Sequence, residues 1–267
     1  MNRVTLFLFG LVFLAACNNH HETTHNGRLA IQFEHYADGQ PVHFDSMMYV
    51  NAAGNLYEVS EIQWFISDIA LVTKDGSTVS VDDGDFAHYV DTNIPQTLRW
   101  DIDQDLLAGE YAAIKMTFGI KGEKNKPNIF TDLPESNMVW PMHMGGDQGG
   151  YHYMKLNGFW KNSTNERQPF NFHLGVGQQR NSGNEITGFI QNWFEIEIPA
   201  SAFILEENKL TVIGIRMNVE KWWESPNIYD HNAFGGSIMN NQEAMGKAAE
   251  NGRKVFSFSG ILADSKI

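Results

Sequence analysis

Histidine and methionine side chains gather in one glycine-rich segment, MVWPMHMGGDQGGYHYM, which runs from Met138 to Met154. The segment holds four of the chain's eleven methionines and two of its ten histidines. A third histidine, His173, follows in FNFHLG. Neutral imidazole and thioether groups are the ligands that copper(I) selects where no thiolate is present. The residues that could bind such an ion here are His143, His152, His173, Met142, Met144 and Met154.

Other interpretations of these residues remain open from spacing alone. Calcium and magnesium prefer carboxylate and carbonyl oxygens, and zinc accepts histidine but gains little from methionine. A single inward histidine is more often a core residue held by a hydrogen bond, and a methionine on a strand more often fills a gap. The gathering of three histidines in one region is what favours copper over a purely structural role.

The elements around the cluster would have to bring these side chains together. If Tyr151 to Leu156 is a strand, His152 and Met154 share one face. The glycine pairs before it would let a loop turn sharply and fold Met142, His143 or Met144 back toward His152. In the next segment, Asn171 and His173 lie on the face opposite Phe172.

Most of the remaining chain also has the alternating or short apolar runs of strands. Examples are RLAIQFEH, EIQWFISDIALV, EYAAIKMTFGI and KLTVIGIRMNV. In the first of these, His35 lies on the side of Leu29, Ile31 and Phe33 and should point inward. One stretch, about residues 237–250, has a helical pattern with Asn251-Gly252 as its C-cap. We predict a mainly β fold, an antiparallel β-sandwich with one or two short helices near the C-terminus.

The N-terminus has the pattern of a bacterial lipoprotein signal. Arg3 precedes an apolar run that is too short to span a bilayer, and the run ends in Leu-Ala-Ala-Cys17. We expect a signal peptide over residues 1–16, lipid attachment at Cys17, a flexible tether over 17–27 and one folded domain over 28–267. The expected location is the cell envelope, in the periplasm or at the outer membrane, with membrane contact only through the lipid anchor. The alternative is a plain secretory signal with an incidental cysteine.

Composition narrows the range of functions further. Cys17 is the only cysteine, so once lipidated it leaves no thiol for a disulfide, a nucleophile or a metal site. Without Arg3 the chain has 18 basic and 32 acidic residues, a net charge of −14, which argues against nucleic acid as a partner. No G-x-S-x-G or P-loop motif is present. We therefore expect a binding protein and not an enzyme; a hydrolase with an Asp/Glu pair is a remote alternative.

A second class of function rests on aromatic residues. Trp222 and Trp223, with Tyr229, could form a platform for a sugar, although buried aromatics are the simpler explanation. In that alternative the chain is a surface lipoprotein that binds a glycan or a protein, and its histidines are structural.

The chain resembles the MbnP-like copper-binding proteins of bacterial cell envelopes over nearly its whole mature length. The resemblance is carried, in this order, by FEHYADGQPV, YEVSEIQWFISDIAL, MVWP with GGYHYMKLNG, FHLG, NVEKWWESP, SIMNNQEAM and NGRKVF. The sequence departs from the family in a longer spacing between Trp140 and Gly150-Tyr151. His143, within that spacing, is either an extra ligand or part of a loop.

The resemblance implies a β-rich protein outside the cytoplasm that takes part in copper acquisition or handling. Carried over by position, it implies His35, His152 and His173 as copper ligands. Some relatives also contain a tryptophan oxidised to kynurenine by a di-haem partner of the MauG type, and this product helps to hold copper. The candidates for oxidation are Trp140 first and Trp64 second.

Overall fold

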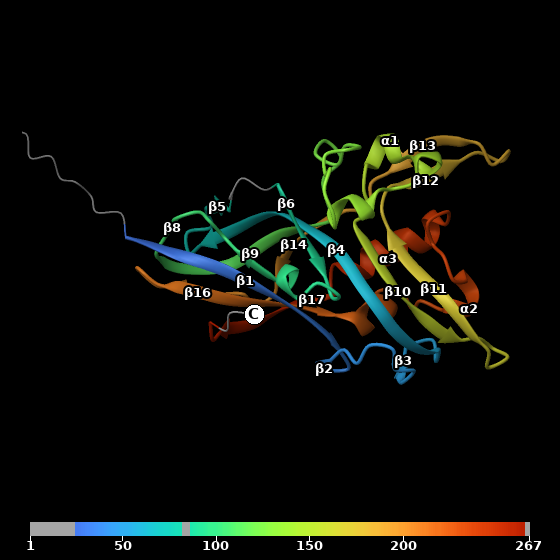
Figure 1. Cartoon of the computed structure of the whole chain (residues 1–267), viewed down its shortest axis with the longest axis horizontal. Helices are drawn as coiled ribbons and strands as arrows, with labels where there is room; N and C mark the ends of the chain where they lie inside the picture. Colours follow the sequence, from blue (N-terminus) through green and yellow to red (C-terminus); the bar gives the residue numbers. More distant parts are fainter. Residues whose placement is uncertain (1–24, 82–85, 265–267) are drawn as a thin grey trace, which may run out of the picture.

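The structure is a computed structural model that describes residues 25–81 and 86–264. The expected signal peptide and Cys17, the expected site of lipid attachment, lie outside the described residues. Two β-sheets of unequal size form the body of the molecule, and a small lobe and a hairpin project from one end (Figure 1). No helix within the described ranges is long and apolar enough to cross a bilayer.

The smaller sheet has six strands and begins with the first described segment of the chain. Its central pair, β1 and β16, is parallel, with Arg28 opposite Leu210 and His35 opposite Met217. The other pairings in this sheet are antiparallel. Its strands are β1 (Asn26–Ala37), β2 (Gln40–Pro41), β7 (Arg99–Asp101), β8 (Leu106–Leu107), β16 (Leu210–Asn218) and β17 (Phe256–Leu262).

The larger sheet has nine strands and is antiparallel in every pairing described. The long strand β4 lies at its centre, between β10 and β9. Its strands are β3 (Tyr49–Val50), β4 (Leu56–Thr73), β5 (Thr78–Ser80), β6 (Ala87–Asp91), β9 (Gly109–Phe118), β10 (Met154–Lys161), β11 (Arg167–Leu174), β14 (Phe194–Ile198) and β15 (Phe203–Leu205).

Large aromatic side chains fill the space between the two sheets. Trp64 of β4 lies edge-on to Phe33 of β1, with ring centroids 5.4 Å apart, and 5.2 Å from Phe256 of β17. The alternating apolar residues of these strands supply this core, because successive side chains on a strand point to opposite faces. The predicted mainly β, antiparallel sandwich is confirmed.

The helices are short and lie outside the two sheets. They are the 3-10 helices η1 (Pro95–Leu98), η2 (Glu135–Met138), η3 (Met142–Met144) and η4 (Val219–Trp223), and the α-helices α1 (Gly146–Gly149), α2 (His231–Phe234) and α3 (Gln242–Gly252). The predicted C-terminal helix exists as α3 but begins later than residue 237. Asn241 caps it, since its side chain accepts a hydrogen bond from the backbone of Ala244, so the residues before it are not helical.

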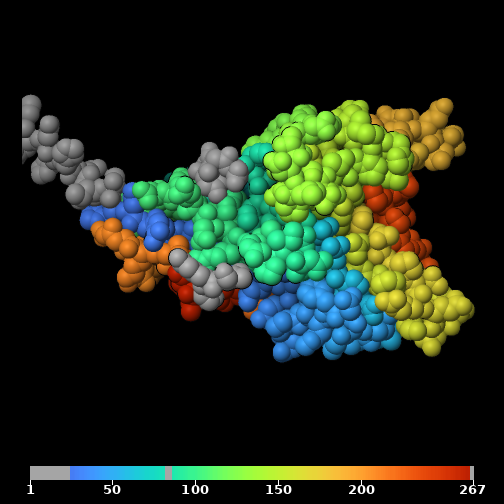
Figure 2. Space-filling model, viewed as in Figure 1, coloured from blue at the N-terminus to red at the C-terminus, as the bar shows by residue number. Residues whose placement is uncertain are grey.

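The segment that leads into β10 forms the projecting lobe together with the β12–β13 hairpin (β12, Gly177–Arg180; β13, Ile186–Ile190). Figure 2 shows the segment before β10 as a rounded yellow-green mass at one end of the molecule, beside the hairpin. The helices η2, η3 and α1 all belong to this lobe. It therefore contains most of the histidine- and methionine-rich segment.

Candidate metal centre

Two of the predicted metal residues, His152 and His173, meet where the lobe joins strands β10 and β11. On β10, Met154 and Leu156 are buried in the core, and Lys155 and Asn157 point to the opposite, outer face of the nine-stranded sheet. Lys155 lies opposite His173 on β11. Phe172 is buried and its neighbours Asn171 and His173 are not, so the prediction that His173 lies on the face away from Phe172 is confirmed.

His152 is held by the backbone just before β10 begins. The carbonyl oxygen of Met138 accepts one hydrogen bond from the His152 backbone N–H, at 2.7 Å, and another from Nδ1 of its ring, at 2.9 Å. Because a carbonyl can only accept, Nδ1 must bear the proton. The other ring nitrogen, Nε2, is buried and has no hydrogen-bond partner among the described residues. A buried acceptor without a hydrogen-bond partner is uncommon in a protein interior, and a bound ligand would explain it.

Two other rings pack against the ring of His152. The imidazoles of His152 and His173 meet edge to face, with centroids 5.2 Å apart, and the centroid of the Trp140 indole lies 4.6 Å from that of His152. The indole N–H of Trp140 donates to the carbonyl of Met144 at 3.0 Å. Gly175 lies directly against the Trp140 ring, because a Cβ there would come within 2.4 Å of it. The indole is therefore held both by a hydrogen bond and by close packing against Gly175.

The surroundings keep both histidines neutral. Burial lowers the pKa of His152 well below its ordinary value, and the nearby His173 and Lys155 lower it further. Burial, with a smaller contribution from Lys155, lowers the pKa of His173 to about 3. Lys155 is itself partly buried, and this burial lowers its pKa. Neutral imidazoles are the form that binds metal, so the pair is ready to bind an ion at neutral pH.

The donor set suits a soft ion of low coordination number. Within the described ranges, no group of three or more His, Cys, Asp or Glu side chains converges. Of these four residue types, only the two histidines could therefore bind an ion here. Calcium and magnesium need several oxygen ligands, and structural zinc takes four ligands. Copper is the ion whose ligand preferences these residues fit best.

The predicted methionine ligands are dispersed. Met154 is buried in the core, so it lies on the opposite face of the sheet from His173, and the expectation that it shares a face with His152 is wrong. The strand begins only at Met154, and the chain before it is irregular, so strict alternation does not extend to His152. Met142 is 62% exposed and His143 is also exposed, whereas Met144 packs partly against the core.

His35 lies apart from this group. As predicted, it points toward the interior, where its Nε2 accepts a hydrogen bond from the indole of Trp64 at 3.1 Å. Trp64 belongs to the core face of β4, opposite Met154, whereas His173 occupies the outer face. The structure thus brings His152 and His173 together with Trp140, and places His35 with Trp64 on the other side of the sheet.

Two residues that the sequence did not single out complete the outer face. Asn157 of β10 accepts a hydrogen bond from Nε2 of His173 at 2.8 Å and donates one to Glu61 of β4 at 3.0 Å. The period-two alternation of β10 already placed Asn157 on the face of Lys155. Its pairing with β4 and β11, however, depends on long-range register that local sequence does not contain.

The aromatic platform of the alternative function does not exist. Trp222 and Trp223 are 0% exposed and Tyr229 is 1% exposed, so none of them can stack on a sugar from solvent. They belong to the main core, where Phe172 packs edge-on against Trp223 with centroids 4.6 Å apart.

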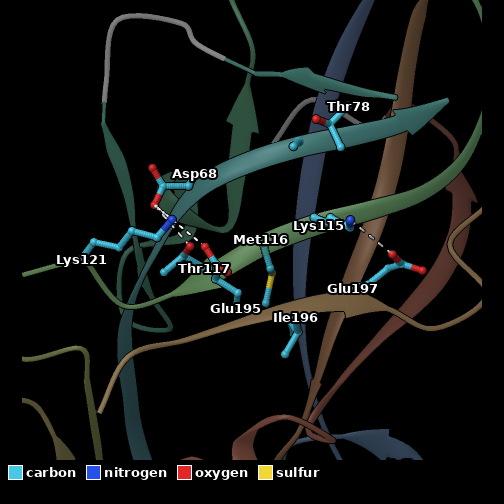
Figure 3. A pocket seen from close by; sticks show the side chains of 10 residues that line it. Asp68, Thr78, Lys115, Met116, Thr117, Lys121, Glu195, Ile196 and Glu197 are labelled. Carbon is cyan, nitrogen blue, oxygen red and sulfur yellow. Dashed lines mark hydrogen bonds and ion pairs between the residues drawn. The ribbon is translucent and has the colours of Figure 1, made fainter. Parts of the chain in front are cut away.

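A shallow groove on the outer face of the larger sheet is also unrelated to the cluster. It crosses β4, β9 and β14, and its charged side chains pair with one another (Figure 3). Lys121 lies 2.6 Å from Glu195 and 3.4 Å from Asp68, and Lys115 lies 3.8 Å from Glu197. Since these charges already neutralise one another, the groove has no evident specificity for a charged ligand.

Comparison with known proteins gives the family. The model of the MbnP family matches residues 26–241. Among solved structures, MbnP from Methylosinus trichosporium superposes with a TM-score of 0.53 at 14% identity, over 89% of this chain and 99% of that one. This likeness extends to the fold alone. No curated protein matches the chain in sequence. The family match covers most of the chain, which therefore belongs to the MbnP family.

Proposed function

We propose that this member of the MbnP family binds copper outside the cytoplasm, with His152 and His173 as the ligands and Trp140 as the wall of the site. The observation that carries the proposal is the buried, unpartnered Nε2 of His152, in a ring that meets the ring of His173 at 5.2 Å. A buried nitrogen lone pair without a hydrogen atom to accept is the state in which imidazole binds a metal ion.

Copper(I) is the favoured oxidation state. Two neutral nitrogen donors and no carboxylate ligand suit a monovalent soft ion better than a divalent one. The ammonium group of Lys155 lies close enough to lower the pKa of both histidines, and it would repel a divalent charge more strongly than a monovalent one. When bound, copper would be the cargo of the protein, held for acquisition or delivery.

Oxidation of a tryptophan is a further part of the proposal. Trp140 is the first candidate for conversion to kynurenine because its ring contacts His152. Trp64 is the second candidate, because its indole nitrogen lies 3.1 Å from a ring nitrogen of His35. The oxidant would be a separate di-haem protein of the MauG type, as the family resemblance implies. Intact mass and peptide mapping of protein from its native envelope would locate the modified residue.

The cellular setting follows from the sequence of the N-terminus. A lipid on Cys17 would hold the domain at a membrane of the envelope. Because Cys17 is the only cysteine, the chain would then have no free thiol, and its copper ligands would be histidine or methionine. We propose a binding role without turnover, since no G-x-S-x-G or P-loop motif is present in the sequence.

The test is a copper(I) competition titration on the purified mature protein. We expect one tightly bound copper per chain in the wild type, and loss of that binding in the double variant His152→Ala, His173→Ala. The double variant His43→Ala, His143→Ala is the matched control, because both of these side chains are exposed. Binding of copper by the His152/His173 variant as tight as wild type would show that the site lies elsewhere.

A further inference from the structure

A chain of polar side chains runs behind His173, away from His152. Nε2 of His173 lies 2.8 Å from Oδ1 of Asn157, and Nδ2 of Asn157 donates to Glu61 at 3.0 Å. The second carboxylate oxygen of Glu61 accepts a hydrogen bond from Asn93 at 2.9 Å. His173, Asn157 and Glu61 lie on β11, β10 and β4, which are neighbours in the same sheet, so strand register holds the partners on both sides of Asn157.

This arrangement fixes which way the amide of Asn157 faces. Its NH2 group must point to the Glu61 carboxylate, because the reverse orientation would place the amide oxygen against carboxylate oxygens with no hydrogen between them. The amide oxygen is thereby directed to His173. An amide oxygen only accepts, so the ring nitrogen facing it, Nε2, must be the one that bears the proton.

The consequence concerns the other nitrogen of the ring. A neutral imidazole has one N–H and one lone pair, so a proton held on Nε2 leaves the lone pair on Nδ1. In His152 the assignment is reversed, because the carbonyl of Met138 holds the proton on Nδ1 and leaves the lone pair on Nε2. The two histidines would therefore bind metal through different ring atoms.

We propose that Asn157, oriented by Glu61, is a positioning residue that selects the Nε2–H tautomer of His173 and makes Nδ1 the metal-binding atom. The inference rests on the proposed function for its meaning, but the tautomer is a property of the metal-free protein. Histidine ligands in metalloproteins characteristically donate their other N–H to a carbonyl or carboxylate, and loss of such a partner weakens metal binding by about 10- to 100-fold.

The first measurement is the tautomer itself, by long-range ¹H–¹⁵N correlation NMR of metal-free protein at pH 7. In the wild type we expect His173 to show a protonated Nε2 and an unprotonated Nδ1. In Asn157→Ala we expect the two nitrogen shifts to move toward each other, as both tautomers become populated. Asn171→Ala is the matched control, because Asn171 lies opposite Asn157 in the β10–β11 register but is exposed, and it should leave the His173 shifts unchanged.

A second variant guards against misfolding of the first. Glu61→Ala keeps Asn157 but removes the group that orients its amide, so we expect a shift of the His173 tautomer in the same direction and of smaller size. The inference is overturned if the wild type has its proton on Nδ1, or if both variants are folded and keep the wild-type nitrogen shifts.

Copper(I) affinity is the second readout, and it separates two kinds of failure. We expect Asn157→Ala to bind copper(I) about 10- to 100-fold more weakly than the wild type and the Asn171→Ala control. If the wild type binds no copper(I), the proposed function fails and the NMR result still decides the tautomer. If the wild type binds copper(I) and Asn157→Ala changes neither tautomer nor affinity, the function stands and this inference fails.

Discussion

The indole N–H of Trp64 donates a hydrogen bond to Nε2 of His35, at 3.1 Å, within the space between the two sheets. An indole nitrogen can only donate, so Nε2 of His35 must supply its lone pair to this bond. Burial lowers the pKa of His35 to about 4, so the ring is neutral at pH 7 and its one proton lies on Nδ1. As long as Trp64 keeps its indole, His35 has no lone pair left for a metal ion.

The variant His35→Ala tests this relationship. We expect copper(I) to bind with wild-type stoichiometry, because His152 and His173 lie on the other face of the sheet. We expect the free energy of unfolding to fall by about 1–3 kcal/mol, because the Trp64 N–H is left buried without an acceptor. Chemical denaturation and copper titration would measure both quantities. Loss of copper with little change in stability would instead make His35 a ligand, as the family resemblance implies.

The exposed residues of the lobe provide a second test. We expect Met142→Ala and His143→Ala, singly or together, to change copper(I) affinity by no more than about twofold. Substitutions of exposed side chains typically change the free energy of unfolding by less than ~0.5 kcal/mol. An effect of that size on the free energy of binding corresponds to about twofold in affinity. The competition titration used for His152 and His173 applies here. A much larger loss would mean that the lobe closes on bound copper and that these two side chains become ligands.

Gly175 offers a test of the wall that Trp140 forms. A Cβ in Gly175→Ala would lie 2.4 Å from the Trp140 ring, so the indole must move away. We expect a loss of about 1–3 kcal/mol in stability from this overpacking and weaker copper binding, because Trp140 packs against His152. Thermal melting and the copper(I) competition titration would measure the two changes.

The control for this variant is Gly246→Ala, in the interior of α3. A Cβ there would meet only the end of the Gln242 side chain, at 3.9 Å. We expect this variant to be more stable than the wild type by about 0.5–1 kcal/mol, because alanine favours the helix over glycine. A Gly175→Ala variant that is as stable as the control would mean that Trp140 is not tightly held.

The lowered pKa of His231 determines part of the pH dependence of stability. It is 1% exposed, it stacks on Phe170 with centroids 4.8 Å apart, and neither of its ring nitrogens has a hydrogen-bond partner among the described residues. Burial lowers its pKa to about 4. Between pH 6.5 and 4 the unfolded chain therefore binds a proton that the folded chain does not. The free energy of unfolding should fall, as pH is lowered through this range, by up to about 1.4 kcal/mol per pH unit from this residue.

The variant His231→Phe isolates this contribution. We expect a shallower loss of stability between pH 6.5 and 4, and at pH 7 a gain of about 1 kcal/mol, since two buried nitrogens without hydrogen bonds are removed and a planar aromatic ring is kept. Urea denaturation at several pH values measures both effects. An unchanged pH slope would show that His231 is protonated in the folded protein or that it opens to solvent.

The strands were predictable because their signal is local. Leu29, Ile31 and Phe33 alternate with polar residues, and β1 buries them as expected. The same alternation placed His35 inward and His173 on the face away from Phe172. The parallel pairing of β1 with β16 joins segments far apart in the chain, and periodicity carries no information about such partners.

The candidate site was predictable only in part, for a similar reason. The sequence identified His152, His173 and Trp140 by residue type and by family resemblance. It misplaced His152 relative to Met154, because the backbone becomes irregular before β10, where the Met138 carbonyl takes both N–H groups of His152. Asn157 and Glu61 were missed because a hydrogen bond across strands depends on register, and neither residue type is itself unusual.

The residues proposed to bind copper all come from one β-hairpin and the lobe that precedes it, within a short stretch between Trp140 and His173. Strand pairing already holds these segments together, so an ion would join parts of the chain that are neighbours without it. Metal binding would therefore have little entropy cost of loop closure to offset. Small domains that fold only when metal is bound differ in this respect. Under the proposed function, copper would therefore be loaded onto a domain that is already folded.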